Sequence, residues 1–308
     1  MRAIVQTAIG GPEVLTVSDV PTPRPERGQV LVRLKAAGIN PVDVAVRAGF
    51  YPLLGEPPFT IGWDIAGTVE AVGEGVTAFK AGDAVFGMPY FPKQAAAYAE
   101  YAVAPANELA TKPEALDFVP AAGLPLAGLT AWQALVDAGG LKAGDRVLIH
   151  AAAGGVGHLA VQIARARGAH VVATASTGKL DFVRSLGADE AIDYTAADFT
   201  KKVRDIDIVL EPLGGDHAAL SLKTLRPGGI IAALLTPSDS AKAEIDRSGA
   251  RFARIGVRPD GPSLTELAAL AEAGKLKVHV ARTFPLAEAG AAHTFLATKP
   301  IGKVVLTL

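Results

Sequence analysis

Arg146-Val-Leu-Ile-His150, followed directly by Ala151-Ala-Ala-Gly-Gly-Val-Gly157, is the stretch of this 308-residue chain that decides its fold. A short apolar strand ends in a glycine-rich turn, and residues 161–167 then follow helical spacing. Glycine allows the tight turn and lets a ligand approach the backbone closely. The first turn of the helix presents unbonded N–H groups and the positive end of the helix dipole. This order of strand, turn and helix predicts a pyrophosphate cradle, although Ala152 replaces the first glycine of the usual pattern.

The tip of the next strand, His170-Val-Val-Ala-Thr-Ala175, indicates which dinucleotide the cradle takes. An acidic side chain at this place would accept a hydrogen bond from the ribose 2′-hydroxyl of NAD. Ser176 and Lys179 stand there instead, and a hydroxyl with a lysine suits the 2′-phosphate of NADPH. The alternative makes Ser176 a helix N-cap and Lys179 a solvated side chain. We favour NADPH because the acid that marks NAD is missing.

The composition excludes several classes of protein. Lys and Arg total 30 against 31 for Asp and Glu, which gives a net charge of −1. The chain therefore lacks the excess of basic residues that is typical of nucleic-acid-binding proteins. The absence of cysteine excludes disulfides, thiolate nucleophiles and cysteine-ligated metals. The N-terminal residues lack the apolar core of a signal peptide, and polar side chains interrupt the most apolar window, 147–164, so no membrane span is expected. These observations predict a soluble, cytoplasmic protein.

Two sequence patterns divide the chain. Up to residue 123, alternating runs separated by Gly and Pro turns are typical of a β-rich domain. From residue 124, strands alternate with helices, as in a doubly wound parallel sheet with crossover helices, which makes the fold class α/β. A helix at 263–273 and another at 286–297 are expected near the C-terminus. The expected strands are 146–150, 170–175, 190–193, 206–211, 228–235, 251–257, 277–281 and 302–308.

Short motifs along nearly the whole chain carry a family resemblance. They are Ala37-Gly-Ile-Asn-Pro-Val-Asp43, Arg47-Ala-Gly-Phe-Tyr51, Gly62-Trp-Asp-Ile-Ala-Gly-Thr-Val-Glu70, Gly128-Leu-Thr-Ala-Trp132, Gly187-Ala-Asp189, Ile192-Asp-Tyr194 and Gly302-Lys-Val-Val-Leu306. In this order they resemble the zinc-free medium-chain dehydrogenase/reductase superfamily, close to the zeta-crystallin-like quinone oxidoreductases. The resemblance implies a GroES-like catalytic domain in residues 1–123, a Rossmann NADP-binding domain in 124–262, and a segment, 263–308, that returns to the catalytic domain.

The resemblance also implies an activity, which is hydride transfer from NADPH to a quinone or an α,β-unsaturated carbonyl compound. Asn40 and Trp63 match the positions of two zinc ligands of zinc-bearing relatives, and neither is a credible ligand, so no metal is expected. Asn40 and Tyr51 are the candidate catalytic groups, because hydrogen-bond donors stabilise charge that develops on the acceptor oxygen. Ala45, where relatives carry a tyrosine, and Trp63 are assigned to the substrate pocket. The alternative for Tyr51 is a loop-packing aromatic, and for Trp63 a core residue.

The remaining site residues are expected to bind the cofactor. They are Asn40, Thr130, Ala153, Gly154, Gly155, Val156, Gly157, Ser176, Lys179, Tyr194, Leu234 and Lys303. Thr130 has the alternative role of a helix cap, and Lys303 that of a solvated strand lysine. Asp43 and Arg47 are expected to form a buried structural pair beneath the site.

The expected partners are a small-molecule acceptor and a second copy of the chain. The segment 251–257 has apolar residues at alternate positions and is the last strand of the parallel sheet, and such edges are normally covered or paired. The resemblance implies a homodimer joined through this edge. Two alternative functions stay open: an enoyl or alkenal double-bond reductase, and a cofactor-binding regulatory or RNA-binding protein with little turnover.

Overall fold

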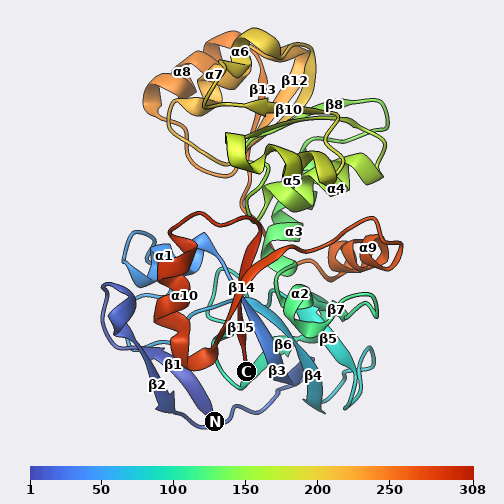
Figure 1. Ribbon diagram of the computed structural model, residues 1–308. Helices are drawn as coiled ribbons and strands as arrows, with labels where there is room; N and C mark the ends of the chain where they lie inside the picture. The colour runs from blue at the N-terminus through green and yellow to red at the C-terminus, as the bar shows by residue number, and fades with distance from the viewer. The chain divides into compact units, whose positions relative to one another are not determined.

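Six parallel strands form the sheet that carries the glycine-rich turn (Figure 1). Their order is β10-β9-β8-β11-β12-β13, so the first strand in sequence lies in the interior and later strands extend the sheet on both sides. This is the doubly wound order of a Rossmann domain, and it confirms the predicted fold class. The strands are β8 (Arg146–Ile149), β9 (His170–Ala175), β10 (Glu190–Asp193), β11 (Ile206–Glu211), β12 (Leu225–Ala233) and β13 (Arg251–Arg254).

The strands predicted at 170–175, 190–193 and 206–211 are confirmed residue for residue. The largest differences are in β12, which begins before the predicted residue 228, and in β13, which ends before the predicted residue 257. Arg254 is opposite Ala233, the last residue of β12, so β13 ends where its hydrogen-bonding neighbour ends.

Helices cover both faces of this sheet. Figure 1 shows α4 (Gly157–Ala166) and α5 (Leu180–Ser185) on one side, with α7 (His217–Leu222) and α8 (Asp239–Ser248) on the other. Shorter segments are η3 (Gln133–Ala138), η4 (Thr177–Lys179) and α6 (Phe199–Lys202). A core of apolar side chains fills one layer between sheet and helices: Leu148, Val172, Ile192, Phe199, Val203, Ile206, Val209, Ile231 and Ala233.

A second, largely antiparallel sheet has seven strands, in the order β14-β15-β3-β4-β5-β7 with β6 paired to β3. Its strands are β3 (Gln29–Ile39), β4 (Asp64–Val72), β5 (Ala84–Gly87), β6 (Tyr101–Pro105), β7 (Leu109–Thr111), β14 (Val280–Pro285) and β15 (Lys303–Thr307). A separate hairpin joins β1 (Arg2–Gln6) to β2 (Leu15–Asp19). This sheet is the GroES-like part of the predicted fold.

The C-terminal strand returns to this second sheet. β15 pairs antiparallel with β3, with Val304 opposite Ile39, which confirms the strand predicted at 302–308. The strand predicted at 277–281 is misplaced, because β14 runs from Val280 to Pro285. Lys277 instead exchanges hydrogen bonds of 2.8 and 2.9 Å with the Gln162 side chain on α4, which takes it out of the sheet.

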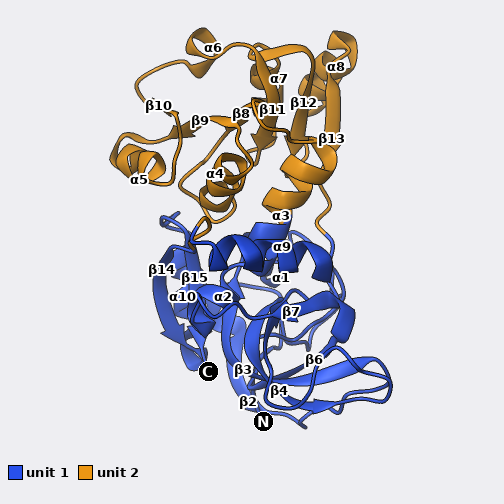
Figure 2. Cartoon of the chain, turned by 90° about the vertical axis from the view of Figure 1, so that its right-hand side faces the viewer, with its two compact units in different colours: residues 1–129, 258–274, 278–308 blue, residues 130–257, 275–277 orange.

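The computed structural model describes residues 1–308, which divide into two compact units (Figure 2). Unit 1 comprises residues 1–129, 258–274 and 278–308, and unit 2 comprises residues 130–257 and 275–277. The longer helices of unit 1 are α1 (Pro41–Arg47), α2 (Phe118–Ala122), α9 (Gly261–Glu272) and α10 (Ala289–Leu296), with the short turns η1 (Pro12–Val14), η2 (Ala106–Glu108) and η5 (Leu286–Glu288). Helix α3 (Pro125–Trp132) spans the boundary between the two units in the sequence.

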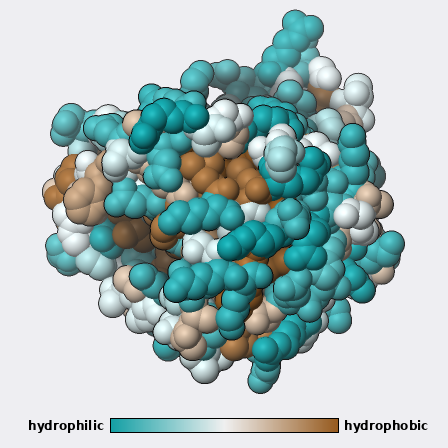
Figure 3. Space-filling view, turned by 90° about the horizontal axis from the view of Figure 1, so that it is seen from above, coloured by the Kyte–Doolittle hydropathy of each residue, from teal (hydrophilic) through white to brown (hydrophobic).

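The surface in Figure 3 is mostly hydrophilic, and its hydrophobic atoms gather in a few patches between polar side chains. None of the helices has both the length and the apolar character that crossing a bilayer requires.

Candidate active site

The glycine-rich turn joins β8 to α4 in unit 2. Gly157 is the first residue of α4, and a Cβ atom built on it would lie 2.4 Å from the Ala151 carbonyl oxygen and 2.7 Å from Ala152 Cα. Only glycine therefore fits where the helix starts against the strand. Gly154, Gly155 and Val156 remain partly exposed. The Gly154 N–H donates to the Ala151 carbonyl at 2.9 Å, so the N–H groups of Gly155 and Val156 are the ones left for a ligand at the N-terminus of α4. The residues present fit a dinucleotide pyrophosphate.

The other predicted cofactor residues of unit 2 follow the ends of neighbouring strands. Ser176 and Lys179 come after β9, Tyr194 after β10, and Leu234 after β12. Because all these strands are parallel, the residues lie at the same edge of the sheet as the glycine turn. The Tyr194 N–H donates to the Ala175 carbonyl at 3.2 Å, which joins the tips of β9 and β10.

The alternatives for these residues have different outcomes. Ser176 occupies the N-cap position of η4, but its side chain makes no capping hydrogen bond. Tyr194 is 56% exposed at its strand tip. Thr130 lies inside helix α3, so its alternative role as a helix cap is wrong.

A carboxylate at the same two strand tips was missed by the sequence reasoning. Asp193 accepts a hydrogen bond from the Thr177 hydroxyl at 2.5 Å, and from the Thr195 hydroxyl at 2.6 Å and its N–H at 2.9 Å. These donors lower the pKa of Asp193, the hydroxyl of Thr177 most, so the group carries a negative charge at neutral pH. It stands on the strand that precedes Tyr194, at the edge where the 2′-phosphate is expected. The signal lies in the Ile192-Asp-Tyr motif, of which only the tyrosine is among the expected cofactor residues.

Asn40 is the centre of a buried polar group in unit 1. It follows β3 and is the N-cap residue of α1, and its exposed fraction is 1%. Its Nδ2 donates to Asp64 Oδ2 at 2.9 Å, while the Lys303 Nζ donates to its Oδ1. Lys303 Nζ and Asp64 Oδ2 are 3.5 Å apart, and the other Asp64 oxygen accepts from the Leu126 N–H at 2.7 Å.

Lys303 has an unexpected environment. Its exposed fraction is 3%, so the alternative of a solvated strand lysine is wrong. Burial lowers its pKa and raises that of Asp64, and in each case the opposite charge of the partner resists the shift. The sequence showed both residue types but gave no sign that they meet, because positions 64 and 303 are far apart in the chain.

A second buried chain of polar groups begins one helical turn further along α1. Asp43 Oδ2 accepts from the Asn40 N–H at 2.7 Å and from the Tyr98 hydroxyl at 2.9 Å. The same hydroxyl lies 3.0 Å from His293 Nε2. Burial raises the pKa of Asp43 to about 7 and lowers that of His293 to about 3.

Arg47 does not join this chain as expected. Asp43 and Arg47 are both buried, but the carboxylate bonds to Asn40 and Tyr98, and Arg47 Nε has no hydrogen-bond partner. The expected buried pair is therefore corrected: Tyr98, not Arg47, is the side-chain partner of Asp43.

The residues assigned to catalysis and the substrate pocket fall into two environments. Tyr51 is 50% exposed, and its N–H donates to the Ala45 carbonyl at 3.2 Å, so these two residues are neighbours. Trp63 is fully buried, its indole N–H donates to the Lys93 carbonyl at 2.7 Å, and its ring meets Phe91 edge-on at 5.2 Å. In this structure Trp63 packs in the core, as its alternative role states, and does not lie beside Tyr51 and Ala45 on an accessible surface.

The donor set does not fit a catalytic zinc ion. No group of three or more His, Cys, Asp or Glu side chains is arranged to hold a metal. Asn40 and Trp63, which match two ligand positions of zinc-bearing relatives, provide neither a thiolate nor an imidazole.

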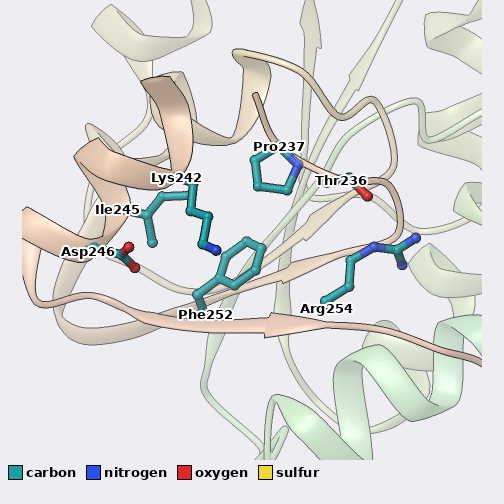
Figure 4. Close-up of a pocket in the computed structure, with 7 residues that line it drawn as sticks. All are labelled: Thr236, Pro237, Lys242, Ile245, Asp246, Phe252 and Arg254. Carbon is teal, nitrogen blue, oxygen red and sulfur yellow. The ribbon is translucent and has the colours of Figure 1, made fainter. Parts of the chain in front are cut away.

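A pocket of about 210 Å³ opens elsewhere on unit 2, between α8, β13 and the loop after β12 (Figure 4). Its walls combine apolar and charged side chains: Thr236, Pro237, Lys242, Ile245, Asp246, Phe252 and Arg254. None of the predicted site residues lines it.

Comparison with known proteins places the chain in a family. Residues 26–114 match the model of the alcohol dehydrogenase GroES-like domain, and residues 186–306 match that of a zinc-binding dehydrogenase. The quinone oxidoreductase of Rattus norvegicus is 35% identical, with 100% of this chain and 98% of the relative covered. The 2-haloacrylate reductase of a Burkholderia species is 38% identical, with 99% and 98% covered.

A solved structure agrees over the same length. The Escherichia coli quinone oxidoreductase complexed with NADPH superposes with a TM-score of 0.90 at 30% identity, with 100% of both chains covered. The resemblance found in the sequence motifs is thereby confirmed. The chain is an oxidoreductase, and it belongs to the quinone oxidoreductase family of the medium-chain dehydrogenase/reductase superfamily.

Proposed function

We propose that this protein transfers a hydride from NADPH to a quinone or an α,β-unsaturated carbonyl compound without a metal ion. The observation that carries the proposal is the placement of the Gly154–Gly157 turn after the interior strand β8. The strand order reverses beside β8, and such a switch point is where doubly wound sheets bind dinucleotides. The relative from Escherichia coli was solved with NADPH, which supports the same cofactor here.

The residues of unit 2 would bind the phosphates of NADPH. The partly exposed turn of Gly154, Gly155 and Val156, with the N–H groups of Gly155 and Val156 at the N-terminus of α4, suits the pyrophosphate. Ser176 and Lys179, with Tyr194 at the adjoining strand tip, suit the 2′-phosphate. When bound, the nicotinamide ring supplies the hydride.

The residues of unit 1 would assist the acceptor. A quinone or an enone is electron-poor enough to take a hydride directly once it is held in near-attack geometry. Negative charge then develops on an oxygen atom, and the amide of Asn40 and the hydroxyl of Tyr51 are the donors we assign to it. A backbone hydrogen bond of 3.2 Å joins Tyr51 to Ala45, so both residues we assign to the acceptor lie in the same segment.

A second candidate acceptor is the double bond of a conjugated acid or aldehyde. The relative named 2-haloacrylate reductase, at 38% identity, favours it. An enone and a conjugated acid or aldehyde both take the hydride at the β-carbon, whereas a quinone is reduced to a hydroquinone, so the candidates differ in which acceptor the pocket prefers.

Two further parts of the proposal concern organisation. Residues 1–123 with 263–308 would form the catalytic domain, and residues 124–262 the cofactor domain. Strand β13 pairs only with β12, so its other edge is available to join a second copy in a homodimer. A mass near that of the 31.6 kDa monomer in analytical ultracentrifugation would refute the dimer.

The test is an acceptor panel. Purified protein is mixed with NADPH and, in turn, benzoquinone, an alkenal, a cyclic enone and 2-chloroacrylate, while the loss of NADPH absorbance is followed. We expect turnover with at least one acceptor, and the ratio of kcat/KM values ranks the two candidates. Binding of NADPH without oxidation by any acceptor would refute the enzymatic proposal and favour a cofactor-binding regulatory protein.

A further inference from the structure

The carboxamide of Asn40 is held at both ends by groups of opposite charge. Its oxygen accepts from the Lys303 ammonium, and its nitrogen donates to the Asp64 carboxylate at 2.9 Å. All three side chains are almost completely buried, with exposed fractions of 3% or less. Water therefore does not compete for these hydrogen bonds.

We propose that Lys303 and Asp64 are positioning residues, which fix the orientation of the Asn40 carboxamide before any ligand binds. An asparagine amide has two donor hydrogens and one acceptor oxygen. The nitrogen bonds within the chain only to Asp64, so one of its hydrogens has no partner inside the protein. Lys303 thus acts through Asn40 and not as a ligand of a cofactor phosphate.

Rotation of the amide by 180° is opposed at both ends. The flipped side chain would place its N–H₂ group against the Lys303 ammonium, which has only donors. It would also place its carbonyl oxygen against Asp64, whose two oxygens act as acceptors in the observed arrangement. In a buried site of low dielectric constant, two such mismatches leave a single orientation of Asn40.

The fold brings the three residues together from distant parts of the chain. Val304 is opposite Ile39 in the β15–β3 pair. Because the two strands are antiparallel, Lys303, which precedes Val304, is adjacent to Asn40, which follows Ile39. Asp64 begins β4, on the other side of β3. Its second oxygen accepts from the Leu126 N–H in the first turn of α3, which fixes the carboxylate independently of Asn40.

The consequence for activity rests on the proposed function. If Asn40 donates to the acceptor oxygen or the nicotinamide, loss of its orientation lowers the rate of hydride transfer more than it lowers binding. Misplacement of a positioned group by about 1 Å costs on the order of 100-fold in rate.

The first experiment observes the Asn40 amide itself and needs neither cofactor nor turnover. The chain has only two asparagines, Asn40 and the exposed Asn107, so ¹⁵N-asparagine labelling gives two pairs of side-chain amide signals. We expect the Asn40 pair to be protected from hydrogen exchange in the wild type. In Lys303→Met the protection is lost and the signals shift, while the Asn107 pair stays unchanged and serves as the internal control.

The second experiment measures kcat, KM and the NADPH dissociation constant of Lys303→Met, Lys303→Arg and Asp64→Asn. We expect Lys303→Met to lower kcat by about 100-fold, with NADPH affinity changed only a few-fold, and Lys303→Arg to recover most of the rate. The matched control is Lys112→Met, which removes the same ammonium from another lysine of unit 1, bonded to the Pro113 and Leu116 carbonyls. It should leave kcat unchanged.

Two results would overturn the inference. One is an Asn40 amide pair that stays equally protected in Lys303→Met. The other is a Lys303→Met protein that keeps the wild-type kcat but loses NADPH affinity in a salt-dependent way, since this is the signature of a phosphate contact. Failure of the wild type itself to oxidise NADPH would refute the proposed function and leave the exchange experiment as the test of positioning.

Discussion

Asp43 gives the sharpest prediction about stability. It is fully buried, and its Oδ1 atom has no hydrogen-bond partner, while Oδ2 accepts from Asn40 and Tyr98. Burial raises its pKa from 3.8 to about 7, so the folded protein holds a proton that the unfolded chain releases above pH 4. Asp43→Asn replaces this acid with a neutral group of the same shape that keeps an acceptor for Asn40 and Tyr98.

The direction in which the unfolding free energy changes with pH follows from the linkage between protonation and folding. A group whose pKa is higher in the folded state stabilises fully below its unfolded pKa, and the contribution is lost as the pH rises through the folded pKa. One pH unit corresponds to about 1.4 kcal/mol, so the interval from 3.8 to about 7 amounts to about 4 kcal/mol. Between pH 5 and pH 8 the wild type should lose about 3 kcal/mol of unfolding free energy relative to Asp43→Asn.

The assay uses the two tryptophans of the chain. Trp63 is buried in unit 1, and Trp132 lies in unit 2, so a Trp132→Phe background leaves Trp63 as the sole tryptophan reporter of unit 1. Urea unfolding of the full chain is followed by Trp63 fluorescence at several pH values, with and without Asp43→Asn. Asp117→Asn provides the control, because Asp117 is exposed, lies in the same unit and makes no side-chain capping bond.

A stability difference between the wild type and Asp43→Asn that stays constant from pH 5 to pH 8 would refute the reasoning. It would mean that Asp43 titrates alike in the folded and unfolded chains, and that burial does not control its proton.

Three other changes test the cofactor edge of unit 2. Lys179→Ala should weaken NADPH binding by tens- to hundreds-fold in calorimetry and leave NADH binding nearly unchanged. The reason is that a hydrogen bond to a charged group, here the 2′-phosphate, is worth about 1.5–3 kcal/mol. Equal losses of affinity for both cofactors would contradict this role of Lys179. Asp193→Asn should strengthen NADPH binding relative to NADH, because it removes a negative charge from the strand tips beside Tyr194, and an unchanged ratio would place the phosphate elsewhere. Gly157→Ala should lower the unfolding free energy by about 1–3 kcal/mol and abolish dinucleotide binding, since its Cβ would lie 2.4 Å from the Ala151 oxygen. Gly178→Ala, with no atom within 4 Å of the added Cβ, is its control in thermal unfolding.

The parallel sheet could be predicted from sequence because the residues of each strand, taken alone, show a strand pattern. An apolar run such as His170–Ala175 is buried on both faces, and polar or glycine residues mark where it ends. The same pattern placed the candidate cofactor residues at one edge, because in a parallel sheet the residues that follow each strand share that edge. Short-range information was therefore sufficient for the fold of unit 2 and for the placement of its candidate site.

Strand β14 shows where such reasoning fails. The segment 277–281 alternates like a strand, but Lys277 is hydrogen-bonded to Gln162, which lies 115 positions earlier in the chain. No local pattern reports a partner at that distance, and the strand begins only at Val280, where β15 offers backbone hydrogen bonds.

Lys303 was misjudged for a related reason. Alternation along an antiparallel strand normally sends every second side chain to solvent, which makes a surface lysine a reasonable expectation at the start of β15. β15, however, lies between β14 and β3, and its first four residues are all buried. A lysine in such a strand must find an acceptor inside the protein, because burying an unpaired ammonium is strongly unfavourable. Asn40 and Asp64 meet this requirement. The hydrogen bond from Lys303 that satisfies its buried charge also fixes the Asn40 amide. The requirement that a buried lysine find acceptors inside the protein is therefore sufficient to explain why this candidate catalytic side chain has one orientation.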